Sequence, residues 1–347
     1  MEGIIDSFTI APGYRISRII KGGWQLAEGH SSKNGSDPIA DMFAFVEAGI
    51  TTFDCADIYT GVETLIGSFV QANRKLNQPY QVKIHTKFVP DYNRLGKLNK
   101  ASVEEIINRS LQRLGMERLD MVQFHWWDYA VPGYLETIGW LKEIQQMGKI
   151  HLLSTTNFNV EKTREIVDAG FDVATAQVQY SLLDPRPEGS LINYCKENDI
   201  NLLCYGTLAG GFLSDRWLGI SEPHDLTNRS LIKYKLMIDE AGGWDVFQSL
   251  LRTLKKIGDK HTASISTIAI NYILNKPQVA AAIVGARNAN HIQDYKLLFQ
   301  LKLDDEDRQA IGQTRKEMNT PPDDVFDLER QKEGKHGRIM KYNLNVS

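Results

Sequence analysis

The sequence predicts a closed (β/α)₈ barrel, also called a TIM barrel, on three observations. Short apolar or β-branched runs alternate with longer stretches of helical periodicity, which is typical of parallel strands joined by crossover helices. Several of these runs are almost entirely apolar, as expected for strands that are covered on both faces. Eight units over roughly 280 residues fit a closed barrel better than an open sheet, and the sequence has no GxGxxG or GxxxxGK[ST] motif.

The expected strands are short and spread along the chain. They are Ser17–Ile20, Thr51–Ala56, Val82–Phe88, Leu119–His125, Ile150–Asn157, Val173–Tyr180, Asn201–Tyr205 and Ala280–Gly285. A hairpin is expected before the barrel, because Phe8–Ile10 and Tyr14–Ile16 flank the turn sequence Ala11-Pro12-Gly13.

Helical periods and capping residues fill the gaps between these strands. The expected helices are Pro38–Ala48, Val62–Gln71, Ser102–Leu114, Tyr134–Met147, Val160–Ala169, Ser190–Asn198, Trp244–Ile257, Ser264–Leu274 and Asn288–Leu298. Asp37 and Asn159 precede Pro38–Ala48 and Val160–Ala169, and Gly148 and Gly170 follow the ends of Tyr134–Met147 and Val160–Ala169.

Length and composition limit the class of protein. A barrel fills about 250 residues as one domain, so the 347 residues predict a single domain with the barrel at about 17–300 and a tail at about 301–347. The net charge of −3 lacks the positive excess that is typical of proteins that bind nucleic acid. Apolar runs such as Val279–Gly285 are too short to span a membrane, and the N-terminus has no apolar signal region. Cys55, Cys195 and Cys204 fit reduced thiols, which indicates the cytoplasm.

Two segments interrupt the repeat. Asp215–Gly243 is a long polar insertion after the seventh strand, and it is either a solvated loop with one helix or a flap over a cofactor. Asn319–Ser347 mixes both signs of charge, and it is either a solvated or packed tail or a pocket lid or subunit contact. No interface is legible, so the oligomeric state stays open.

Polar side chains follow the predicted strands where each strand ends. In chain order these residues are Trp24, Asp54, Lys87, His125, Asn157, Gln177 and Tyr205. Chemistry in such barrels gathers at the C-terminal ends of the strands, so we expect these residues to share one site.

Four of these residues suggest proton transfer to a carbonyl oxygen. A lysine at the end of a covered strand needs a partner, and Asp54 can pair with Lys87. An adjacent ammonium lowers the pKa of a tyrosine such as Tyr59, and His125 can donate a hydrogen bond to a carbonyl oxygen. The alternative is a structural ion pair beside a rim tyrosine. A metal-dependent hydrolase is disfavoured, because no HxH pair ends the first strand and no carboxylate-rich set joins His125.

Seven segments in order resemble the aldo-keto reductase family. They are FDCADIYTGVE, HTKF, QFHWWD, STTNF, QVQYSLLD, CYGTLAGGFLS and AAIVGARNANHI, and together they cover most of the chain from about Gly22 to Tyr295. The resemblance implies a (β/α)₈ barrel that binds NADP(H) without a Rossmann domain.

The resemblance also implies a role for each matching residue. Tyr59 would be the general acid, Lys87 and Asp54 would tune it, and His125 would orient the carbonyl. The implied cofactor contacts are Gly23, Trp24, Asp54, Thr156, Asn157, Gln177, Tyr205, Gly206, Leu208, Gly210, Gly285, Ala286, Arg287, His291, Asp294 and Tyr295. Glycines after the seventh strand would let backbone N–H groups approach phosphate oxygens.

The sequence departs from the family pattern at several of these positions. Cys55 replaces a threonine, Thr155-Thr156 replaces a small residue and serine, and Gly206-Thr207 replaces serine and proline. His291 stands where many members place an arginine on the 2′-phosphate, and Arg287 could supply that charge. NADP(H) is therefore expected, and NAD(H) is the alternative.

The predicted activity is reduction of a small aldehyde or ketone to an alcohol, with no metal, membrane or nucleic acid involved. Trp24, Trp126 and Trp127 form either rim packing or an aromatic wall for an apolar or aromatic carbonyl compound. A nucleotide-sensing regulatory subunit is the second interpretation, although a pure binding module needs no tuned acid.

Overall fold

A computed structural model of the chain describes residues 5–27, 37–286 and 288–345. Its centre is a closed barrel of eight parallel strands in the order β10-β3-β4-β5-β6-β7-β8-β9. The strands are β3 (Ile19–Gly22), β4 (Thr52–Asp54), β5 (Lys83–Phe88), β6 (Leu119–Phe124), β7 (Ile150–Thr156), β8 (Thr175–Gln179), β9 (Asn201–Tyr205) and β10 (Val279–Gly285). The predicted TIM barrel is confirmed.

A small antiparallel hairpin precedes the barrel, as predicted. It pairs β1 (Ser7–Ala11) with β2 (Tyr14–Ser17). Tyr14 and Ile16 from the hairpin pack in one cluster with barrel side chains such as Met121 and Leu203. The predicted strand Ser17–Ile20 was wrong as one unit, because the hairpin strand ends at Ser17 and the barrel strand begins at Ile19.

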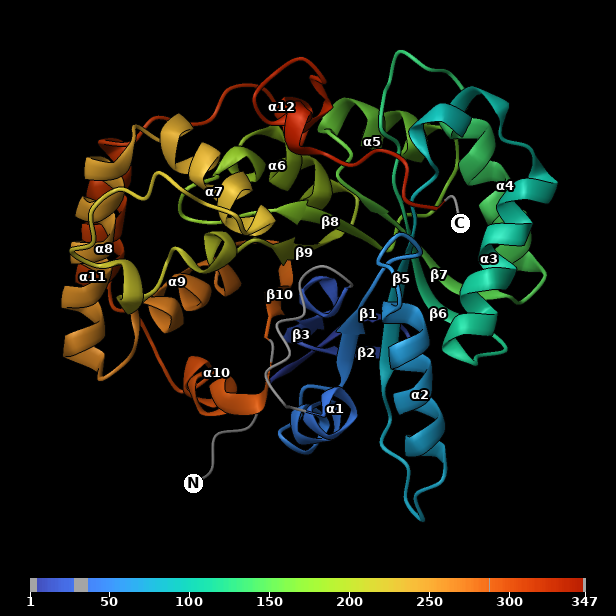
Figure 1. Cartoon of the computed structure of the whole chain (residues 1–347), viewed down its shortest axis with the longest axis horizontal. Coiled ribbons are helices and arrows are strands. Elements are labelled where there is room, and N and C mark those ends of the chain that lie inside the picture. The colour runs from blue at the N-terminus through green and yellow to red at the C-terminus, as the bar shows by residue number, and fades with distance from the viewer. Residues whose placement is uncertain (1–4, 28–36, 287, 346–347) are drawn as a thin grey trace.

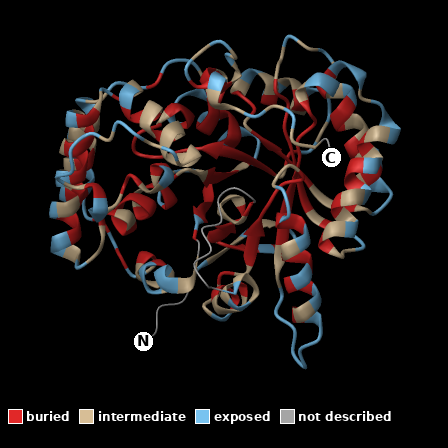
Figure 2. Ribbon diagram, viewed as in Figure 1, coloured by how far each residue is buried: buried red, intermediate tan, exposed pale blue. Residues whose placement is uncertain are grey.

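Helices surround the barrel and bury one face each against it (Figures 1 and 2). They are α1 (Pro38–Glu47), α2 (Val62–Arg74), α3 (Lys100–Leu114), α4 (Tyr134–Gln146), α5 (Val160–Asp168), α6 (Ser190–Glu197), α8 (Trp244–His261), α9 (Ile265–Leu274), α10 (Ile292–Leu298) and α11 (Asp305–Lys316). The side chains of Asp37 and Asn159 cap α1 and α5 as predicted. None of the described helices is long and apolar enough to cross a membrane.

The insertion and the tail add two further helices at the mouth of the barrel. The insertion forms α7 (Arg229–Glu240), which Asn228 caps through its side chain. The tail forms the short helix α12 (Asp327–Arg330) and then continues across the mouth (Figure 1). Near its end, Leu344 and Asn345 donate backbone hydrogen bonds to the Asp91 carboxylate, each at 2.8 Å. These two hydrogen bonds anchor the end of the tail to the loop after β5.

Candidate active site

A cavity of about 610 Å³ opens at the C-terminal ends of the barrel strands. Its walls come from the strand ends, from α7 and from the tail. The predicted residues that line it are Trp24, Asp54, Tyr59, Lys87, His125, Trp127, Thr156, Asn157, Gln177, Tyr205, Gly206, Leu208, Gly210, Gly285 and His291. The structure thus brings most of the predicted site residues together.

A buried ion pair lies at the base of this cavity. The Lys87 ammonium donates to Asp54 Oδ2 at 2.6 Å and to the Cys55 carbonyl oxygen at 2.9 Å, and both charged side chains are almost fully buried. Asp54 Oδ1 accepts from the side-chain amides of Gln123 at 2.8 Å and Gln177 at 2.7 Å. Burial alone would lower the pKa of Lys87, but Asp54 outweighs it and the net shift is upward. Lys87 therefore stays charged.

Tyr59 stands directly beside this pair. The Lys87 nitrogen lies 5.3 Å from the centre of the Tyr59 ring, and the Trp24 ring meets Tyr59 edge-on at 5.0 Å between centroids. The sequence led us to expect a lowered tyrosine pKa. Instead, burial raises the pKa of Tyr59, and Lys87 offsets that rise only in part. Tyr59 therefore keeps its proton at neutral pH and can give it to an oxyanion.

A contact with a backbone carbonyl oxygen fixes the tautomer of His125. Its Nδ1 lies 3.2 Å from the Thr156 carbonyl oxygen, which can only accept, so Nδ1 carries the proton. Burial lowers the pKa of His125 to about 3, which keeps the ring neutral and leaves Nε2 without a proton. Donation from Nε2 to a carbonyl oxygen would need the other tautomer, so the donor role of His125 stays a prediction.

The polar residues after β7 and β8 form the opposite wall. Asn157 adopts a left-handed backbone conformation, with φ of 63°, which is uncommon outside glycine. Its side-chain oxygen accepts from the Tyr205 hydroxyl at 2.8 Å, which fixes both side chains. Thr156 Oγ1 is buried and has no hydrogen-bond partner among the described residues. This wall offers polar groups to a ligand.

The comparisons with known proteins agree with this geometry. The model of the aldo/keto reductase family matches residues 18–316. The chain belongs to the aldo/keto reductase family. It is 29% identical to the aldo-keto reductase YhdN of Bacillus subtilis (strain 168), over 86% of this chain and 90% of that protein. It is 26% identical to the NADH-specific methylglyoxal reductase of Escherichia coli (strain K12), over 84% and 92%.

Solved structures share the fold. The glycerol dehydrogenase AKR11B4 from Gluconobacter oxydans superposes with a TM-score of 0.74 at 22% identity, over 93% of this chain and 98% of that one. The aldo-keto reductase AKR2E5, solved as a complex with NADPH, superposes with a TM-score of 0.71 at 21% identity, over 95% and 92%.

In this aldo-keto reductase, some predicted residues lie outside the cavity. Trp126 is fully buried behind the wall, where its ring nitrogen donates to the Val131 carbonyl oxygen at 3.0 Å. Only Trp127 of the pair lines the cavity, because consecutive residues point in different directions. The other predicted contacts that do not line it are Gly23, Ala286, Asp294 and Tyr295. Arg287 lies outside the described residues.

The glycines of this aldo-keto reductase after β9 have a packing role that the sequence did not suggest. Gly206 and Gly210 have φ of 71° and 66°, and a Cβ at either position would collide with the ring of Tyr234. Tyr234 belongs to α7, so the glycines let this helix lie close over the loop. The close approach of α7 explains why both residues are glycine, whether or not they also contact a cofactor phosphate.

Sequence reasoning missed the residues that the tail contributes to this family site. Phe326, with a left-handed φ of 63°, places its ring 5.4 Å from that of His125 and 6.4 Å from that of Trp127. Arg330 donates to the backbone carbonyl oxygens of Trp126 at 3.1 Å and Asn157 at 2.7 Å. No strand or helix period marked these residues, so only the fold could reveal them.

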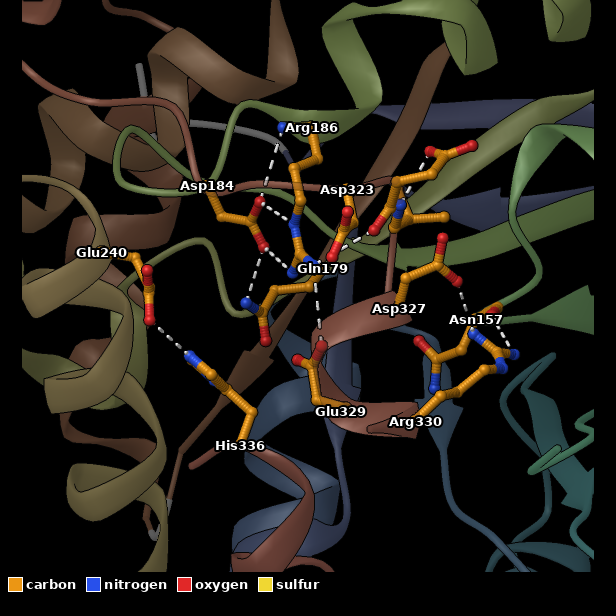
Figure 3. Close-up of polar contacts among 12 residues, drawn as sticks. Asn157, Gln179, Asp184, Arg186, Glu240, Asp323, Asp327, Glu329, Arg330 and His336 are labelled. Carbon is orange, nitrogen blue, oxygen red and sulfur yellow. Dashed lines mark hydrogen bonds and ion pairs between the residues drawn. The ribbon is translucent and has the colours of Figure 1, made fainter. Parts of the chain in front are cut away.

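A second buried charge network joins the tail to the rest of the mouth (Figure 3). Glu329 is fully buried, 3.4 Å from the Lys233 ammonium of α7 and 3.6 Å from the Arg186 guanidinium. Arg186 also binds Asp184 through two nitrogens, at 2.7 and 2.8 Å. The described residues hold no cluster of three or more His, Cys, Asp or Glu side chains that could bind a metal.

Proposed function

We propose that this chain is an NADP(H)-dependent carbonyl reductase in which Tyr59 is the general acid. The observation that carries the proposal is the buried Lys87–Asp54 pair, at 2.6 Å, beside a protonated tyrosine in an open cavity. A surface ion pair contributes little to stability and a buried one often costs it. A chemical role explains why this pair lies under the tyrosine.

The cavity fits a nicotinamide ring and its carboxamide. Thr156 supplies a buried hydroxyl that has no partner in the described part of the chain, and Asn157 and Gln177 place amide groups on the same wall. We propose that these three residues hold the carboxamide and that Tyr205 lies against the ring. When bound, the reduced cofactor supplies a hydride to the carbonyl carbon.

Tyr59 supplies the proton that completes the reduction. Its hydroxyl donates to the carbonyl oxygen, and the proton moves to that oxygen as negative charge develops there. The phenolate that remains is stabilised by the Lys87 ammonium until it regains a proton from solvent. In this tautomer His125 shapes the pocket, and Tyr59 is the acid.

The substrate end of the cavity favours a neutral aromatic or apolar carbonyl compound. Its walls include Trp24, Trp127, Phe326, Met340 and Leu344. Aromatic and aliphatic walls with few polar groups bind apolar ligands. We propose such a compound as the substrate class and the cytoplasm as the place of action.

The choice between NADP(H) and NAD(H) depends on the adenosine end. Relatives differ, since one is named an NADH-specific reductase and one neighbour was solved with NADPH. We propose NADP(H), with Arg287 as the cation for the 2′-phosphate. The Arg287→Ala variant should weaken NADPH binding about tenfold more than NADH binding, measured by fluorescence titration. Equal losses would remove Arg287 from this role.

The proposal is tested by following cofactor oxidation optically with a panel of aldehydes, ketones, quinones and sugars. Turnover is expected with aromatic aldehydes or ketones and should survive treatment with a chelator. Tight cofactor binding without turnover over the whole panel would favour a nucleotide-sensing subunit. Loss of activity on chelation would favour metal-dependent chemistry.

A further inference from the structure

We infer that Gln123 is a positioning residue that sets which end of the Gln177 amide faces the cavity. The inference rests on the proposed function, because it concerns how the acid pair and the nicotinamide site are connected. Gln123 opens the segment QFHWWD, but the resemblance implies no role for it. Its hydrogen bonds with Asp54 and Gln177 point to one.

Gln123 lies inside the barrel and is fully buried. It sits on β6 directly opposite Lys87 of β5 in the strand register, two residues before His125. Its amide nitrogen donates to Asp54 Oδ1 at 2.8 Å, and its amide oxygen accepts from Gln177 at 2.6 Å. Gln123 therefore contacts the acid pair and the proposed cofactor wall at once.

These contacts leave only one orientation for each amide. The Asp54 carboxylate can only accept hydrogen bonds, so the nitrogens of both glutamines must turn toward it. Gln177 then uses one N–H on Asp54, at 2.7 Å, and the other on the Gln123 oxygen. A reversed Gln177 amide would press its oxygen against a carboxylate and face Gln123 with a second acceptor.

The side-chain oxygen of Gln177 is therefore the atom that remains available for a hydrogen bond to a ligand. Gln177 lines the cavity, and both of its N–H groups are already used. The oxygen can accept a hydrogen bond from the NH₂ of a nicotinamide carboxamide, but Gln177 cannot donate one. Without Gln123, one N–H of Gln177 loses its partner in a buried site, so the amide is driven to turn toward another acceptor.

The first test measures binding without any chemistry. The probes are NADP⁺ and its 3-acetylpyridine analogue, in which a methyl group replaces the carboxamide NH₂. Wild-type protein should bind NADP⁺ about tenfold more tightly than the analogue, as expected for one lost hydrogen bond at a buried acceptor. In Gln123→Met this preference should fall below about threefold. Dissociation constants from tryptophan fluorescence supply the measurement.

A matched control is available in Gln248. This glutamine is also buried and donates to the Trp217 carbonyl oxygen at 2.8 Å, but it does not line the cavity. Gln248→Met removes a buried amide of the same kind and should keep the tenfold preference. A general loss of packing would instead change both variants equally.

The second test uses the conservative variant Gln123→Glu and does not depend on Gln123→Met folding. When protonated, this glutamic acid can donate to Asp54 and accept from Gln177 as Gln123 does. The groups that face it are Asp54 and Lys87, with His85 two residues before Lys87. Burial lowers the pKa of His85 to about 4, so His85 stays neutral above that pH. Burial and the Asp54 charge raise the pKa of the introduced acid.

The variant should therefore turn over like wild type near pH 6 and lose about tenfold in kcat relative to wild type as pH rises toward 9. A kcat ratio that stays constant with pH would overturn the inference, as would a wild-type protein that binds both cofactors equally. Absence of turnover in wild type would instead refute the proposed function, and the binding ratio would still decide the role of Gln123.

Discussion

Asp54 and Glu329 are two buried carboxylates at the mouth of one barrel, and they are held in different ways. Asp54 accepts short hydrogen bonds from Lys87, Gln123 and Gln177, all on barrel strands. Glu329 has two cations nearby, at 3.4 and 3.6 Å, but neither oxygen has a hydrogen bond among the described residues. Barrel strands fix the spacing around Asp54, whereas Glu329 depends on how a tail and an inserted helix meet.

The comparison shows that the proposed catalytic residues and the segments that cover them are held by two separate networks. The Asp54 network is built from β4, β5, β6 and β8 of one closed barrel, whose strand spacing the sheet imposes. The Glu329 network joins α12 and α7 to the loop after β8. We expect damage to the first network to abolish turnover and damage to the second to alter access and stability.

Among the variants that separate the two networks, the largest effect is expected from the lysines that pair with these carboxylates. Lys87→Met should lower kcat about 100-fold, because the phenolate loses its stabilising charge. Cofactor affinity should stay within about threefold. The matched variant Lys233→Met should keep kcat within about threefold and raise KM for the carbonyl compound instead. Steady-state kinetics decides, and equal kcat losses in both variants would break the distinction.

The next effect concerns the tail residue nearest to the acid site. Phe326→Ala removes a ring that lies 5.4 Å from that of His125. Catalytic efficiency for bulky aromatic carbonyl compounds should fall about tenfold, while small aliphatic aldehydes should change less than about threefold. Competing substrates of the two sizes provide the measurement. The same loss for both sizes would show that Phe326 does not shape the pocket.

A smaller effect on turnover but a clear effect on the tail is expected from Glu329→Gln. Breaking a buried charge network costs about 3 kcal/mol, since Lys233 and Arg186 lose their shared partner. Limited proteolysis after residue 319 should therefore become at least about tenfold faster. An unchanged cleavage rate would show that the network does not hold the tail.

The same carboxylate predicts a pH dependence for the wild-type tail. Burial raises the pKa of Glu329, but Lys233 and Arg186 outweigh burial and the net shift is downward. A lowered folded-state pKa means that the stabilisation is present above the ordinary value and is lost as pH falls through the folded-state value. Tail cleavage in wild type should therefore accelerate in acid, and Glu329→Gln should remove that component.

The smallest expected change is in the pH profile of carbonyl reduction. The pKa of Tyr59 is raised above its ordinary value and that of His125 lies at about 3. Neither group titrates between pH 6 and 9, so kcat should vary by less than about twofold there. Reduction should decline only above about pH 10, where a tyrosine loses its proton. A tenfold inflection near neutrality would contradict these assignments.

The residues at the ends of the repeated barrel strands could be predicted from the sequence. The contacts that the tail and the insertion make across the mouth of the barrel could not. Asp54, Lys87 and His125 follow apolar strands, so their convergence could be read from the strand pattern alone. Gln123 lies on β6 two residues before His125, which directly follows that strand, so alternation could have placed both on the same inner face. At the break in the first predicted strand, the Arg18 side chain donates to the carbonyl oxygens of Leu274, Val279 and Ala280. Contacts with residues so far along the chain leave no local signal.

There is a physical reason why the roles of the tail and the insertion could not be predicted from the sequence. Arg330 binds the carbonyl oxygen of Asn157, 173 positions away, and no periodicity links the two. The resemblance implies that Gly206 and Gly210 contact the cofactor phosphates, and the structure adds that Tyr234 of α7 lies close to both. Contacts between irregular segments follow from three-dimensional packing and leave no period in the sequence.

The most direct test of Tyr59 as the proton donor is a comparison of Tyr59→Phe with wild type in two measurements on the same preparation. We expect NADPH affinity within about threefold of wild type and kcat for the best carbonyl substrate lower by at least about 1,000-fold. Tyr59→Phe with wild-type turnover would contradict the assignment of Tyr59 as the acid.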